Sequence, residues 1–276
     1  MNLIQALILG LIQGATEFIP VSSSGHLVLV PWLLGWPAPG LLFDTVVHWG
    51  TLVALLAVFW QDLWQLARAW LLSLRGQVRG TPVDETVKTD ARLAWWIIMG
   101  TIPAALIGWL FEDWFEKLFA TPLAAAAFLS LTAAILAASE RWGRRDKPLA
   151  RMSLADALLI GLAQAAAIAP GISRSGATMG MGLARGLRRD SAARYAFLLA
   201  TPIIFGAGLL QLIDLFGASG EGAELPPLII GFLTAAASGY ACIRFLLRYL
   251  QRGRLYPFAI YCAAVGATAL LLAFLR

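Results

Sequence analysis

Six apolar segments, each long enough to cross a bilayer as a helix, constrain the fold of this chain more than any other feature. The hydrocarbon core of a bilayer takes about 20 consecutive apolar residues in helical form. The six segments are, approximately, 42–62, 93–111, 121–139, 195–217, 226–247 and 256–275. Hydrophobic residues make up 59% of the chain and charged residues only 13%, so a soluble domain would lack the polar surface to cover itself. The sequence predicts an all-α integral membrane protein.

One unusual motif occurs twice, 151 residues apart, each time after a proline and an apolar run of helix length. The two copies are Ser22-Ser23-Ser24-Gly25 and Ser173-Arg174-Ser175-Gly176. The same offset does not align the ionisable groups, because Glu17 falls on Ile168 and His26 on Ala177. We interpret the chain as an internal duplication, with repeat one at 1–150 and repeat two at 151–276. Repeats that share a frame but differ in polar groups favour one asymmetric site where they meet.

Each copy of the motif is followed by only a short apolar arm, 27–36 in repeat one and 177–187 in repeat two. A helical arm of about ten residues rises only ~15 Å, half the hydrocarbon thickness. Irregular backbone at membrane depth is tolerated where it lines a protein cavity. We therefore expect two re-entrant helical hairpins, at 3–36 and 154–187, each followed by three spans. A plain bundle of eight spans is the alternative.

The charges of the connecting loops predict an orientation. Loops 63–92, 140–151 and 248–254 carry clusters of Lys and Arg and are expected to be cytoplasmic. Connections 112–118 and 218–225 are acidic or neutral and are expected outside. If both hairpins return to the side from which they start, the two repeats are inverted and both termini lie outside. The hairpin tips would then meet near the midplane of the membrane.

The first tip combines a carboxylate, hydroxyls and a histidine. Its catalytic candidates are Glu17, Ser23 and His26, and its candidate phosphate ligands are Gln13, Ser22 and Ser24. A carboxylate at membrane depth is functional by default, although a structural hydrogen bond from Glu17 to the loop is an alternative. An imidazole titrates near neutral pH, which suits proton transfer by His26; a satisfied core histidine is the alternative. His48, within span 42–62, has no comparable cluster in sequence and is expected to be structural.

The second tip has the composition of a phosphate site. Glycines let backbone approach an anion, and amides at the start of the following helix point toward it. Arg174 adds a permanent planar cation, although an Arg at this depth needs an anionic partner and an ion pair with Glu17 alone is an alternative. Arg174 is the catalytic candidate of this tip, and the candidate phosphate-binding residues are Ser173, Ser175, Gly176 and Thr178. A nucleophile, a proton-transfer group and an anion clamp together suit phosphoryl transfer.

The first tip, QGATEFIPVSSSGH, and the second, PGISRSGAT, closely resemble the two signature motifs of the BacA-type undecaprenyl-diphosphate phosphatase family. FDTVVHWGTL and ARYAFLLATP look like further family segments, so the resemblance covers nearly the whole chain. It implies removal of the terminal phosphate of undecaprenyl diphosphate, which recycles the lipid carrier for peptidoglycan synthesis and confers bacitracin resistance when the enzyme is overproduced. It also implies a bacterial inner-membrane protein whose site opens to the periplasm. The positions that match family functional residues are Glu17, Ser23, His26, Ser173, Arg174 and Thr178.

The expected mechanism places the diphosphate against the second tip, where Arg174, hydroxyls and helix amides neutralise developing charge. Ser23 is the expected nucleophile, and His26, oriented or charge-stabilised by Glu17, is expected to take its proton. Direct attack by water, with Ser23 only binding phosphate, is the alternative. A different functional class, a transporter or flippase of the lipid phosphate, also fits inverted repeats with broken helices.

The remaining features bound the partners. The net charge of +5 lies mostly in loops, as membrane orientation requires, so no nucleic-acid partner is expected. Cys242 and Cys262 lie in apolar segments without metal-ligand spacing and indicate no redox chemistry. In the family's E/Q-x-x-x-E motif the first position is Gln13, so no protein metal site is predicted. The sequence leaves open whether a divalent cation, Mg²⁺ or Ca²⁺, binds together with the diphosphate. It also leaves open whether the protein is a monomer or a homodimer.

Overall fold

The computed structural model describes residues 1–76, 84–119, 121–217 and 224–275, which leaves parts of the predicted loops 63–92 and 218–225 outside the described residues. In the described ranges the chain is helical and forms no strand. Six helices are long and apolar enough to span a membrane. They are α3 (Leu41–Leu74), α4 (Glu85–Leu110), α6 (Pro122–Trp142), α9 (Arg189–Gly217), α10 (Leu225–Tyr249) and α11 (Tyr256–Leu275). The predicted all-α membrane class and the six candidate spans are confirmed.

The shorter helices form two hairpins and one connection. They are α1 (Leu3–Phe18), α2 (Ser23–Leu34), α5 (Glu112–Phe119), α7 (Leu154–Ala166) and α8 (Arg174–Ala184), with a 3₁₀ turn at Leu149–Arg151 before α7. The first helix of each hairpin begins with a capping box, Asn2 with Gln5 in α1 and Ser153 with Asp156 in α7. Local sequence therefore defines both starts in the same way, as a duplication requires.

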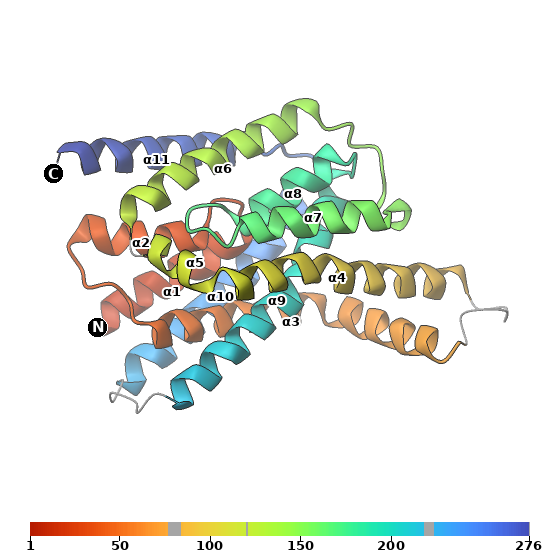
Figure 1. Ribbon diagram of the computed structural model, residues 1–276, viewed down its shortest axis with the longest axis horizontal. Helices are drawn as coiled ribbons and strands as arrows, with labels where there is room; N and C mark the ends of the chain where they lie inside the picture. Colours follow the sequence, from red (N-terminus) through yellow and green to blue (C-terminus); the bar gives the residue numbers. More distant parts are fainter. Residues whose placement is uncertain (77–83, 120, 218–223, 276) are drawn as a thin grey trace.

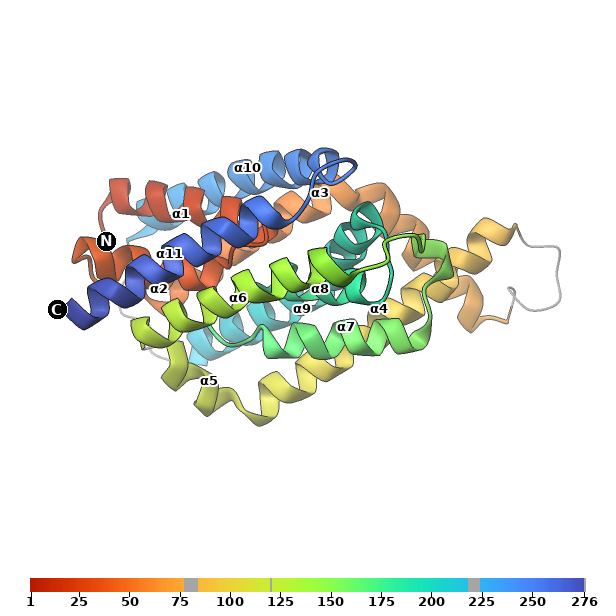
Figure 2. The same ribbon diagram turned by 90° about the horizontal axis from the view of Figure 1, so that it is seen from above.

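The two hairpins point in opposite directions along the bundle. Both chain termini lie at one end of the molecule, and the hairpin of α1 and α2 opens toward that end (Figure 1). The hairpin of α7 and α8 opens toward the other end, where α6 connects to α7 and α10 to α11 (Figures 1 and 2). Each hairpin packs on a span of the other half, α1 along α10 and α7 along α4. The motif segments between the hairpin helices are thereby brought to the middle of the bundle.

Small residues allow these helices to approach closely. A Cβ added at Gly14 of α1 would collide with the carbonyl oxygen of Ala235 in α10. A Cβ at Gly161 of α7 would collide with the carbonyl oxygen of Gly100 in α4. Small residues at such crossings let helix backbones pack tightly in a membrane protein. The position of each motif segment is therefore set by the partner half.

A buried carboxylate holds the connection between α6 and α7 to the bundle. Asp156 is fully buried and accepts hydrogen bonds from Lys147, from Arg185 Nε at 2.9 Å and from the Ser153 amide at 2.8 Å. Burial alone would raise the pKa of Asp156, but the hydrogen bonds from Lys147, Ser153 and Arg185 outweigh it and lower the pKa to about 2. This cluster ties the base of the second hairpin in place.

Candidate active site

The two motif segments contact each other. Glu17, at the end of α1, forms an ion pair with Arg174, the first residue of α8. The amide of Gly171 donates a hydrogen bond to Ser24 Oγ at 3.4 Å. A Cβ added at Gly25 would lie 3.1 Å from Gly171 Cα, so the two backbones nearly touch. Residues that are far apart in sequence thus form one polar cluster.

Backbone geometry explains why serine and glycine occupy the turns. Gly171 has φ +98°, and a Cβ there would collide with the carbonyl oxygen of Ala125 in α6. Ser22 caps α2 at φ 70°, a sparsely populated conformation for a residue with a side chain. Thr132 of α6 holds the second segment, because its Oγ1 donates to the Gly171 carbonyl and accepts from the Ser173 amide, both at 2.9 Å. Sequence reasoning did not identify Thr132, which lies within an apolar span.

Glu17 is the centre of the cluster and is only 6% exposed. Its Oε2 accepts hydrogen bonds from Ser23 Oγ and, at 3.1 Å, from Gln13 Nε2. Its Oε1 pairs with Arg174. Gln13 lies one helical turn before Glu17, so its amide holds the carboxylate in place without adding negative charge. A carboxylate that accepts the hydroxyl proton of a serine is well placed to act as its base.

This cluster lines a cavity of about 240 Å³ that lies between both halves of the chain. Polar residues on its wall are Thr16, Glu17, Ser22, Ser23, Ser24, His48, Gln164, Ser173, Arg174 and Gln211. Apolar side chains of α4, α5, α9 and the turn between α7 and α8 form the rest of the wall. A mostly apolar cavity with a few convergent polar groups is the usual form of a small-molecule site.

Other predicted phosphate ligands do not line this cavity. Gly176 donates its amide to Ser173 Oγ at 3.0 Å, which caps α8. Ser175 Oγ lies 3.2 Å from Ser173 Oγ, and Thr178 Oγ1 donates to the Arg174 carbonyl at 2.7 Å. These buried groups shape the start of α8, and their predicted phosphate contacts stay predictions.

The expected contact between His26 and Glu17 is wrong. His26 Nδ1 lies 2.7 Å from the Ser22 carbonyl, and Nε2 lies 2.8 Å from the Tyr261 hydroxyl of α11. The ring also stacks on Tyr261, with centroids 5.7 Å apart, and His26 is only 6% exposed. Both ring nitrogens are therefore engaged away from Glu17. Packing of α11 against the first hairpin, which no local pattern reports, decides this orientation.

His48 was expected to be structural, but the structure places it at the cavity. It was expected to lack a polar cluster, but it lines the cavity with Nε2 3.9 Å from Glu17 Oε2. Its side chain is 34% exposed. The segment around His48 resembles a family segment, and that was the one signal in the sequence that could have drawn attention to it.

Gln164 is a second cavity residue that sequence reasoning did not assign. It is 1% exposed, lines the cavity, and neither its Oε1 nor its Nε2 has a hydrogen-bond partner among the described residues. Burying an amide without a partner costs free energy. Its alignment with Gln13 under the repeat offset was the available signal.

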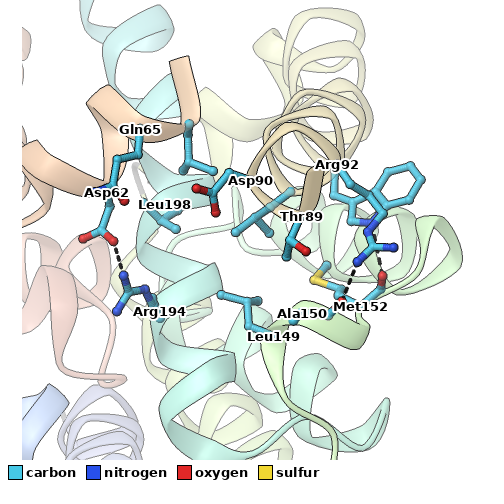
Figure 3. Close-up of a pocket in the computed structure, with 13 residues that line it drawn as sticks. Asp62, Gln65, Thr89, Asp90, Arg92, Leu149, Ala150, Met152, Arg194 and Leu198 are labelled. Atoms are coloured by element: carbon cyan, nitrogen blue, oxygen red, sulfur yellow. Dashed lines mark hydrogen bonds and ion pairs between the residues drawn. The ribbon is translucent and has the colours of Figure 1, made fainter. Parts of the chain in front are cut away.

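A second polar pocket lies away from the motif segments, between α3, α4 and α9 (Figure 3). Its most prominent contact is the ion pair between Asp62 and Arg194, and Arg92 donates to the Ala150 carbonyl at 2.8 Å. None of the predicted site residues lines this pocket. Among the described residues, no hydrogen bond joins the Thr89 hydroxyl of this pocket to a carboxylate, so the candidate site remains the cavity at Glu17.

The donor set at the cavity does not fit a metal ion held by protein alone. Over the described residues, no group of three or more His, Cys, Asp or Glu side chains converges. Both oxygens of Glu17 are already engaged by Arg174, Ser23 and Gln13. Hard divalent cations require six or more oxygen ligands, most of which the substrate and water would have to supply.

Comparisons with known proteins agree with this site. The family model described as bacitracin resistance protein BacA matches residues 6–268. Three relatives carry the name undecaprenyl-diphosphatase. The one from Desulforudis audaxviator is 41% identical over 276 residues, and the alignment covers 100% of this chain and 100% of the relative. The one from Nocardioides sp. is 43% identical over 275 residues, covering 98% of this chain and 96% of the relative. The one from Rubrobacter xylanophilus is 45% identical over 270 residues, covering 97% of each. The chain therefore belongs to the bacitracin resistance protein BacA family.

Proposed function

We propose that this chain hydrolyses undecaprenyl diphosphate to undecaprenyl phosphate and inorganic phosphate, and so recycles a lipid carrier for peptidoglycan synthesis. The observation that carries this proposal is the contact of three groups in one cavity, the Ser23 hydroxyl, the Glu17 carboxylate and the Arg174 guanidinium. The names of the relatives supply the substrate. The transporter alternative draws support from symmetry alone, whereas function has to be argued from the site.

In the first step, Ser23 Oγ attacks the terminal phosphorus while its proton passes to Glu17, to which it is already hydrogen-bonded. The bond from phosphorus to the bridging oxygen breaks, and undecaprenyl phosphate leaves. Arg174 stabilises the charge on the transferred phosphoryl group as a planar donor. When the substrate binds, some N–H groups of Arg174 donate to the phosphate in place of Glu17. This leaves Glu17 free to accept the proton.

In the second step, water attacks the phosphoserine and releases inorganic phosphate. Ser23 Oγ takes back a proton from Glu17, so the enzyme returns to its starting state. The alternative, direct attack of water on the diphosphate, uses the same Arg174 clamp but leaves Ser23 as a phosphate ligand. Both routes give the same products.

We further propose that the two hairpins are re-entrant and the repeats inverted, with the cavity opening to the periplasmic side of the bacterial inner membrane. The opposite directions of the hairpins support this arrangement (Figures 1 and 2). Loop charge supports the orientation, because Arg144, Arg145, Lys147 and Arg151 gather in the connection from α6 to α7, at the end away from the termini.

Hydrolysis by the purified protein in detergent tests the function. Inorganic phosphate released from a polyprenyl diphosphate is measured for the wild type, for Ser23→Ala and for Ser130→Ala. Ser130 is a matched control, since within the described part of the chain its hydroxyl bonds only to the Ala126 carbonyl of its own helix, and it does not line the cavity. We expect activity in the wild type and in Ser130→Ala, and a loss of about 10³-fold or more in Ser23→Ala. Lipid transfer across vesicles without phosphate release would contradict the proposal.

A further inference from the structure

One of the two histidines of the chain presents a ring nitrogen to the candidate active site. His48 lies on α3, in its second turn, and its Nδ1 is 2.7 Å from the backbone carbonyl of Asp44. A carbonyl oxygen can only accept a hydrogen bond, so Nδ1 carries the proton. In the neutral ring the lone pair is then on Nε2. This nitrogen faces the cavity and lies 3.9 Å from Glu17 Oε2.

The other histidine cannot serve in the same way. The Ser22 carbonyl engages Nδ1 of His26, and the Tyr261 hydroxyl engages Nε2. His26 therefore holds the first motif segment against α11. Nε2 of His48 has no hydrogen-bond partner among the described residues, and the side chain is 34% exposed, so water can reach it.

We propose that His48 is the general base that activates the attacking water, an assignment that rests on the proposed hydrolysis. Glu17 is occupied with the proton of Ser23 in the first step and must return that proton when Ser23 leaves phosphorus. A second group is therefore needed to take the proton of the water. His48 is the titratable group on the cavity wall that is left for this task among the described residues.

Hydrolysis of the phosphoserine moves two protons. The oxygen of water forms a bond to phosphorus, and the bond from phosphorus to Ser23 Oγ breaks. One proton of the water passes to His48 Nε2, and Ser23 Oγ receives the proton held by Glu17. His48 then returns its proton to water at the mouth of the cavity. In the direct route, the same transfer to Nε2 accompanies attack of water on the diphosphate itself.

Charged neighbours favour the protonated product of this step. The charged or titratable groups that face His48 are Asp44 on its own helix, Glu17 on α1 and Arg174 on α8. Asp44 Oδ1 is buried and makes no hydrogen bond to the described residues. The positive charge of Arg174 would repel the His48 imidazolium, but the phosphate that Arg174 binds neutralises this charge. Glu17 becomes a carboxylate again as its proton passes to Ser23 Oγ, and its charge then stabilises the His48 cation.

Rapid-quench kinetics of His48→Gln test the proposal, with His26→Gln as the same change in the other histidine. In His48→Gln we expect one undecaprenyl phosphate per enzyme to form at nearly the wild-type rate, followed by phosphate release slowed about 10²-fold or more. Phosphoserine at Ser23 should accumulate and be visible by mass spectrometry. The fall of kcat at acid pH that protonation of an imidazole produces should disappear in His48→Gln and persist in His26→Gln.

Three results for His48→Gln would overturn the assignment. They are equal slowing of lipid phosphate formation and phosphate release, an increase in KM with kcat unchanged, and a fall of kcat at acid pH like that of the wild type. A second variant, His48→Ala, guards against a folding defect, because the open cavity admits free imidazole. Added imidazole should restore at least tenfold of its phosphate release, and the absence of rescue in a folded His48→Ala protein would count against the proposal. Turnover that persists in Ser23→Ala with its acid limb intact would remove Ser23 as the nucleophile but keep His48. Absence of hydrolysis in the wild type would instead remove the function.

Discussion

Arg174→Lys separates a phosphate clamp from a structural ion pair. Arg174 contacts Glu17 through a terminal nitrogen, and its side chain is 20% exposed, so the rest of its planar donor set can reach a ligand in the cavity. Lysine keeps the positive charge and can still pair with Glu17, but it loses the fork that binds a phosphate through two parallel hydrogen bonds. The two roles of Arg174 therefore predict different outcomes for the same variant.

The magnitude follows from the number of donors lost. Removing one preorganised donor from a developing oxyanion costs about 2.7–4 kcal/mol of transition-state stabilisation. Since each 1.36 kcal/mol corresponds to a tenfold change in rate, kcat should fall about 10²- to 10³-fold in Arg174→Lys. The unfolding midpoint should change little, because the charge beside Glu17 is kept.

Steady-state kinetics with a polyprenyl diphosphate, together with thermal unfolding in detergent, measure both quantities. Arg194→Lys is the matched control, because it makes the same change in an ion pair, with Asp62, that lies outside the cavity (Figure 3). We expect the control to retain kcat. Near-normal turnover in a folded Arg174→Lys protein would refute the clamp and leave Arg174 as a structural partner of Glu17.

Three further predictions concern the frame of the site. Gly171→Ala should strongly reduce both folding yield and activity, because φ +98° strains the alanine and its Cβ meets the Ala125 carbonyl; a well-folded, active variant would show that the turn relaxes. Asp156→Asn should lower stability by about 1–3 kcal/mol at neutral pH, because the buried side chain loses the charge that strengthens its hydrogen bonds with Lys147 and Arg185. The wild-type contribution of Asp156 should be constant above about pH 4 and be lost as pH falls toward 2, since its pKa is lowered in the folded state; an unfolding midpoint independent of pH in this range would contradict this. With Cys242 and Cys262 replaced by Ser, a membrane-impermeant thiol reagent on intact cells should label Lys117→Cys but not Arg144→Cys, and the reverse pattern would contradict the proposed orientation.

The sequence by itself determined the class of the protein and the chemistry of its site. Length and apolar content require six spans, because a bilayer core admits only long apolar helices. The repeated motif, with Glu17 and Ser23 in one copy and Arg174 in the other, identified the groups that meet in the cavity. These conclusions depend on residue type, segment length and short spacing, which are local properties.

Only the tertiary structure decided which histidine faces the site. His26 stands four residues from Ser22 and was the natural choice by proximity in sequence, yet α11 brings Tyr261 to its ring and turns it away from Glu17. His48 is 31 residues from Glu17 in sequence, and packing of α3 beside α1 places it on the cavity wall. The direction of a side chain depends on how its helix is rotated against its neighbours. That rotation is set by small-residue contacts between the two halves, such as Gly14 with Ala235, and is not encoded in the spacing of either motif.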